Sequence, residues 1–84
     1  MKKYTLFTED LGNLGSLVSK YFDGFTLTET KGSWKGKYEN SVRIEILNPK
    51  KEDLAVYTLV DEIKRKNNQE AVLLEVTEID ARFL

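Results

Sequence analysis

The chain contains no cysteine and no histidine among its 84 residues. These absences exclude disulfide bonds, thiol nucleophiles, imidazole acid–base catalysis and the common zinc ligands other than carboxylate. Small secreted domains are usually stapled by disulfides, so the lack of cysteine favours a cytoplasmic protein. We therefore expect a non-enzymatic protein with no catalytic residue, no cofactor and no bound metal.

Long hydrophobic runs are also missing. No uninterrupted apolar run exceeds four residues, as in Ala71–Leu74, whereas a membrane span needs roughly 20. The basic start Met1–Lys3 is followed by threonines and then by Glu9 and Asp10, which argues against a secretory signal peptide. With 40% hydrophobic residues and a formal charge of −1, residues 1–84 are expected to form one globular domain without membrane contact.

The spacing of the apolar residues predicts six elements in the order strand, helix, strand, strand, helix, strand. Period-two alternation predicts strands over 3–8, 25–31, 42–46 and 69–77. Three- and four-residue spacing predicts helices over 10–23 and 49–66, the first ending at Gly24 in a left-handed cap. The second helix is expected to bury Val56, Leu59, Val60 and Ile63.

Residues 32–40 have turn composition and join the two middle strands into a hairpin. Near Thr77 and Glu78 the apolar alternation slips by one residue, which predicts a bulge, a bend or a new short strand. The element order is typical of an α+β, ferredoxin-like βαββαβ fold, an antiparallel sheet with two helices on one face. The order of the strands within the sheet stays open.

Five short segments share a pattern with other sequences: Lys-Tyr-Thr-Leu at 3–6, Tyr-Phe-Asp-Gly-Phe-Thr at 21–26, Gly-Ser-Trp at 32–34, Val-Arg-Ile-Glu-Ile-Leu at 42–47 and Asn-Gln-Glu-Ala-Val at 68–72. Together they resemble a loose group of short, uncharacterised proteins of Gram-positive bacteria and their phages. The resemblance implies the same fold and a bacterial or phage origin. It implies no catalytic residue.

The predicted hairpin is the one basic segment that also contains aromatic residues. An indole can stack on a base and lysines can neutralise phosphates, so the hairpin is a candidate site for a small anionic ligand or nucleotide. Its candidate binding residues are Lys31, Trp34, Lys35, Lys37 and Tyr38. The alternative interpretation is an exposed turn whose tryptophan folds back onto the sheet. The predicted third strand lacks surface aromatics, which disfavours nucleic-acid binding.

Apolar residues near the C-terminus suggest a protein contact. Leu73, Ile79 and Phe83 are candidate interface residues, because they supply apolar anchors beside the aromatic hairpin. The leading hypothesis is therefore a binding or interaction module that forms a homo-oligomer or docks on a macromolecular partner as an accessory or inhibitor-like protein. The alternative is the small anionic ligand or nucleotide binder that uses the hairpin at 31–38.

Overall fold

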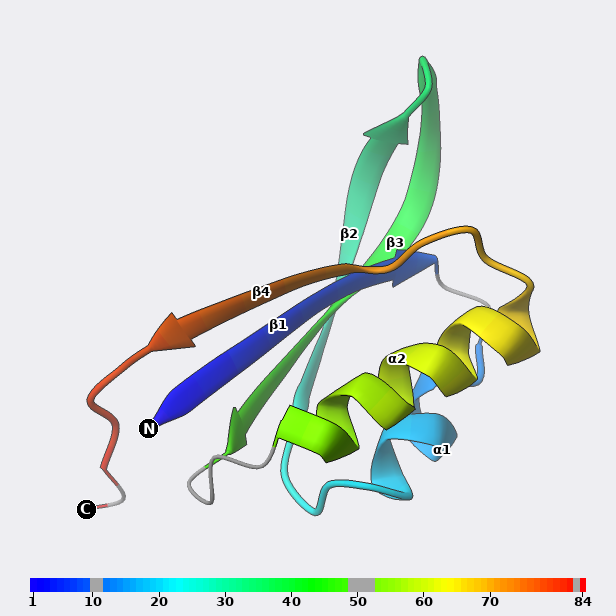
Figure 1. Ribbon diagram of the computed structural model, residues 1–84. Helices are drawn as coiled ribbons and strands as arrows, with labels where there is room; N and C mark the ends of the chain where they lie inside the picture. The colour runs from blue at the N-terminus through cyan, green and yellow to red at the C-terminus, as the bar shows by residue number, and fades with distance from the viewer. Residues whose placement is uncertain (10–11, 49–52, 83) are drawn as a thin grey trace.

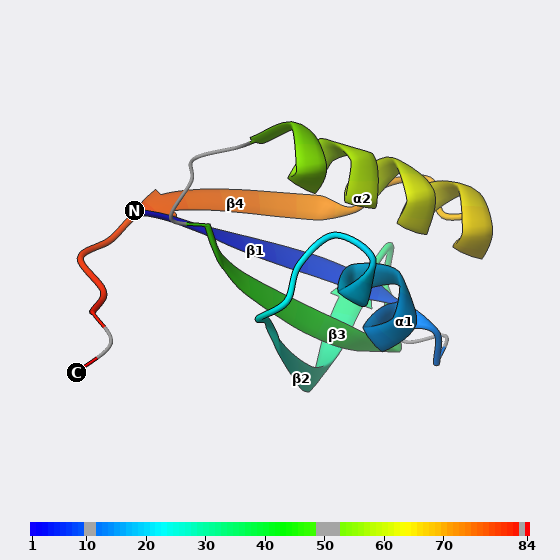
Figure 2. The ribbon, with the colours of Figure 1, turned by 90° about the horizontal axis from the view of Figure 1, so that it is seen from below.

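The computed structural model describes residues 1–9, 12–48, 53–82 and 84 (Figure 1). Its elements are β1 (Lys2–Glu9), α1 (Leu14–Ser19), β2 (Thr26–Trp34), β3 (Lys37–Asn48), α2 (Asp53–Asn67) and β4 (Leu73–Glu78). The strands form one antiparallel sheet in the order β2-β3-β1-β4, and both helices lie on the same face (Figure 2). The predicted ferredoxin-like fold is confirmed.

The core forms between the helices and the two central strands. Alternate residues of β1 point to the helices, so that Tyr4 and Leu6 are buried opposite Ile46 and Ile44 of β3. The buried apolar residues are Tyr4, Leu6, Leu14, Leu17, Val18, Val42, Ile44, Ile46, Val56, Leu59 and Ile63. Val60 was also expected there, but it lies at the margin and is only partly buried.

Helix α1 is shorter than predicted. It begins at Leu14, because Gly12 has a φ of +82°, a left-handed conformation that is incompatible with a helix. Residues 10 and 11, where the helix was predicted to begin, lie outside the described residues. It ends at Ser19, and the amides of Tyr21 and Phe22 then donate hydrogen bonds to the carbonyl of Val18. The expected glycine cap is wrong, because Gly24 does not have a positive φ.

The hairpin is longer and its turn tighter than the composition suggested. Only Lys35 and Gly36 form the turn, and both have positive φ, 51° and 79°. Positive φ at both central residues is typical of a type I′ turn, whose twist matches that of the flanking strands. Most of the predicted turn is therefore paired strand, with Gly32 opposite Glu39 and Trp34 opposite Lys37.

Helix α2 and strand β4 follow the predicted order with shifted ends. The predicted start of the helix at Pro49 lies outside the described residues. The helix ends at Asn67, one residue past the predicted end, and Asn68 has a φ of 52°. Strand β4 ends at Glu78, where the alternation slips. Neither helix has the length and apolar content that a membrane crossing requires, as far as the chain is described.

A charged cluster joins the two helices. Glu62 of α2 is 7% exposed, and its carboxylate accepts hydrogen bonds of 2.6 Å from Lys20 Nζ and from the Tyr21 hydroxyl. Lys66 Nζ lies 3.6 Å from Glu62 Oε1. The hydrogen bonds to Glu62, of which the one from Lys20 has the largest effect, lower its pKa from 4.5 to about 2. The carboxylate therefore ties the end of α1 to the middle of α2.

This cluster predicts a specific acid sensitivity. The folded pKa lies below the unfolded one, so the stabilisation is complete above pH 4.5 and is lost as the pH falls towards 2. The Glu62→Gln variant should have a Tm several degrees below that of the parent at pH 7. Between pH 4.5 and 2, its Tm should fall less than that of the parent. Circular dichroism melts measure this, with exposed Glu75→Gln as the control. Matching acid profiles for parent and Glu62→Gln would contradict it.

Candidate functional site

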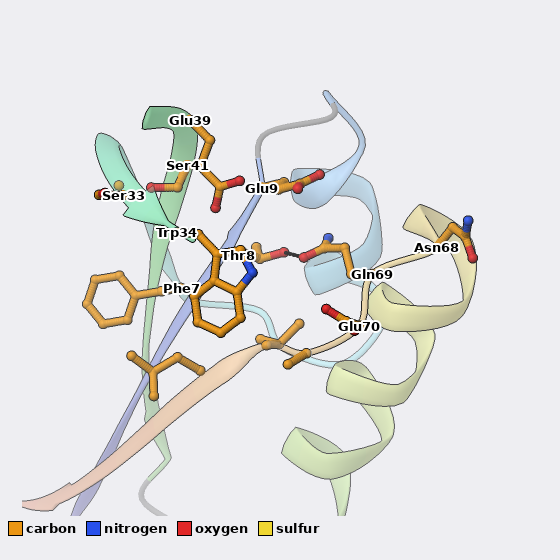
Figure 3. A pocket seen from close by; sticks show the side chains of 14 residues that line it. Phe7, Thr8, Glu9, Ser33, Trp34, Glu39, Ser41, Asn68, Gln69 and Glu70 are labelled. Atoms are coloured by element: carbon orange, nitrogen blue, oxygen red, sulfur yellow. Dashed lines mark hydrogen bonds between the residues drawn. The ribbon is translucent and has the colours of Figure 1, made fainter. Parts of the chain in front are cut away.

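A hollow lies where β1 extends past β4. Strand β1 pairs with β3 as far as Glu9 opposite Ser41, but with β4 only as far as Phe7 opposite Leu73. Between the end of β1, the β2–β3 hairpin and the α2–β4 connection lies a hollow of about 730 Å³ (Figure 3). This volume is within the range of small-molecule sites. The hollow is lined by 7–9, 32–34, Glu39, Ser41 and 68–73.

Trp34 is the largest side chain in this hollow. It lies at the end of β2, opposite Lys37, and is 57% exposed. Two-residue alternation puts it on the same side of the ribbon as Gly32, whose partner is Glu39. Its indole ring extends from the hairpin among side chains of β1 and of the α2–β4 connection (Figure 3). An exposed indole at such a place offers a flat apolar surface to a ligand.

Gln69 supplies a polar group to the wall of the hollow. The end of α2 positions it, because its amide N–H donates to the carbonyl of Lys64 at 3.0 Å. Its side-chain Oε1 accepts a 2.7 Å hydrogen bond from Thr8 Oγ1, which is buried (Figure 3). Its Nε2 is buried and has no hydrogen-bond partner among the described residues. A buried amide without a partner carries a desolvation cost.

The charged residues of the hollow are acidic. Glu9, Glu39 and Glu70 line it, and none of its described lining residues is a lysine or an arginine. Glu70 pairs with Lys35 at 3.5 Å, and both side chains are well exposed. Glu9 and Glu39 form no ion pair within the described part of the chain. The carboxylates do not gather into a metal-binding group in that part either.

The structure separates the predicted binding residues. Trp34 lines the hollow, but Lys31, Lys35, Lys37 and Tyr38 do not. Lys31 lies on the other side of the ribbon, three residues from Trp34, and Tyr38 is 82% exposed. Lys35 Nζ is 5.8 Å from the centroid of the indole and pairs with Glu70. The expected cradle of lysines around a stacked anion is therefore not part of the hollow.

The predicted interface residues do not form one patch. Leu73 is 58% exposed and lies at the edge of the hollow, in a row across the open sheet face with Phe7, Arg43 and Thr28. Ile79 follows the opposite end of β4, where it is partly buried and its N–H donates to the carbonyl of Met1. Phe83 lies outside the described residues.

Several lining residues carried no signal in the sequence. Gln69 is one residue of the predicted last strand, and Glu9 directly follows the predicted first strand. Glu39 was part of a turn. They meet only because the strand register and the end of α2 bring distant segments together.

No protein-family model matches the chain, and no curated protein matches it. Solved structures do match. A DUF3240 family protein from Shewanella baltica OS155 has a TM-score of 0.77 at 14% identity, over 99% of this chain and 93% of that one. CPII, a nitrogen regulatory PII-like protein from Thiomonas intermedia K12 bound to ADP, AMP and bicarbonate, has a TM-score of 0.67 at 16% identity, over 99% and 94%.

A phage SAM lyase in its apo state has a TM-score of 0.72 at 20% identity, over 90% of this chain and 78% of that one. At these identities the likeness shows the shared fold alone.

The position of Trp34 predicts how its removal affects stability. A buried tryptophan contributes roughly 3–5 kcal/mol, but this side chain is more than half exposed. Trp34→Ala should therefore keep a cooperative melt within a few degrees of the parent, as should the more exposed control Tyr38→Ala. Differential scanning calorimetry measures both. A large loss of Tm for Trp34→Ala alone would identify the indole as a core residue.

Proposed function

We propose that this protein is a non-enzymatic binding module that holds a small molecule in the hollow beside Trp34. The observation that carries the proposal is the exposed indole in a hollow of small-molecule size. Binding sites typically combine apolar surface with a few polar groups. Three separate segments of this chain line the hollow with both kinds of side chain.

The indole defines the class of ligand. A planar heteroaromatic ring stacks on an indole, and purines have such a ring. The comparisons support a purine nucleoside, because CPII was bound to ADP and AMP and a second protein of this fold is a SAM lyase. ADP, AMP and SAM all contain adenosine, which is therefore the probe of choice.

Adenosine binding is measurable through the single tryptophan. We expect adenosine to change Trp34 emission saturably and to raise Tm. Trp34→Ala should weaken adenosine binding at least roughly fivefold, because a stacked base contributes about 1–3 kcal/mol. Since this variant has lost the tryptophan, its binding is measured by the change in Tm alone. Tyr38→Ala should bind like the parent. Unchanged emission and Tm at millimolar adenosine and guanosine would contradict the proposal.

The open sheet face favours a second candidate function, contact between copies of this chain. Both helices lie on the opposite face (Figure 2), so Leu73 and Leu47 remain exposed on this one, with Phe7 partly buried between the strands. A second copy of the sheet would cover these apolar side chains. Such a contact would give the homo-oligomer that was predicted from the sequence, with Leu73 as its main apolar contact.

Light scattering coupled to size-exclusion chromatography tests this contact at micromolar concentration. The parent is expected to elute as an oligomer, and Leu73→Ser should shift it towards the monomer because it removes apolar contact area. Leu54→Ser is the matched control, since Leu54 is an exposed leucine on α2. A monomeric parent, or equal effects of both substitutions, would remove self-association.

A further inference from the structure

The unpaired carboxylates of the hollow lie on the same side as the indole. In β3, Glu39 is two residues from Ser41, and Ser41 pairs with Glu9 of β1. Glu39 itself pairs with Gly32 of β2, which is two residues from Trp34. Because side chains alternate along a strand, the two carboxylates and the indole leave the same face. Figure 3 shows both carboxylates and the indole at the hollow. A bound molecule would therefore touch the ring and meet the charges together.

The backbone adds to this negative potential. The α2–β4 connection that forms one wall follows directly on the C-terminus of α2, which carries the negative end of the helix dipole. Lys64, Arg65 and Lys66 lie in this last turn and offset the dipole, but none of them lines the hollow. Lys66 is already paired with Glu62. No lysine or arginine is among the described lining residues, and the ammonium nearest the ring, that of Lys35, is already paired with Glu70. The lining thus offers no unpaired cation of the kind on which phosphate recognition depends.

The indole itself suits a cation. The face of an indole attracts positive charge, and Lys35 Nζ already lies 5.8 Å from the ring centroid. Resting on the proposed function, we infer that the hollow selects a nucleoside-like ligand that carries a positive charge beside its planar ring. Glu9 and Glu39 select this cation over the phosphorylated equivalent, and Trp34 holds the ring.

Three probes with one ring and different charges test the inference. 5′-Amino-5′-deoxyadenosine is protonated at neutral pH, adenosine is neutral, and AMP is an anion. We expect affinity to fall in that order, with the amine at least tenfold tighter than AMP, and the difference to shrink as salt screens the carboxylates. Trp34 emission and Tm report binding of each probe by the full chain.

The carboxylate variants locate the selectivity. Glu9→Gln and Glu39→Gln should each reduce the preference for the amine over adenosine severalfold, measured as the ratio of the two affinities in the same variant. Glu29→Gln, an exposed position on β2 outside the hollow, should change neither. Melts establish that every variant is folded.

Each failure has a distinct meaning. If none of the three probes binds, the proposed function itself fails. If AMP binds as tightly as the amine or more tightly, adenosine-type binding stands and the selection of a cation is overturned. If the amine is preferred but neither glutamine variant reduces the preference, the assignment to Glu9 and Glu39 is wrong.

Discussion

The pairing of β1 with β3 is the constraint on which the rest of the molecule depends. Both strands bury alternate residues under the helices, and Tyr4 and Leu6 face Ile46 and Ile44 in register. A slip of one residue would turn every one of these side chains to the open face. The pairing of β1 with β4 ends at Phe7, two residues before its pairing with β3 ends, so β1 extends past β4. The hollow therefore depends on both pairings of β1.

The helices transmit this alignment to the other wall of the hollow. Glu62 ties α2 to α1 through Lys20 and Tyr21, and the last turn of α2 holds the backbone of Gln69. Gln69 in turn accepts the hydrogen bond of Thr8, so the α2–β4 connection is joined back to β1. The site is thus built from groups that the fold itself immobilises, with the hairpin as its remaining wall.

The sequence predicts the elements with a buried face and misses those without one. The alternation at Val42, Ile44 and Ile46 identifies a strand because one face is packed. Residues 32–40 leave no such pattern, since that ribbon is mostly exposed, and their glycines and lysines imitate a long turn. Trp34 could be singled out because its signal is local. Gln69 and Glu39 could not, because long-range register alone makes them neighbours.

The hairpin also divides the molecule into parts of unequal stability. On the hairpin side of Ser41, where the pairing of β3 with β1 ends, the ribbon has only two strands among the described residues. A two-stranded ribbon is marginally stable on its own, and such segments open at little free-energy cost while the core stays folded. The indole thus sits on this ribbon and faces the part of the sheet that is paired on both sides, so that filling the hollow with a ligand would be thermodynamically linked to ordering of the ribbon.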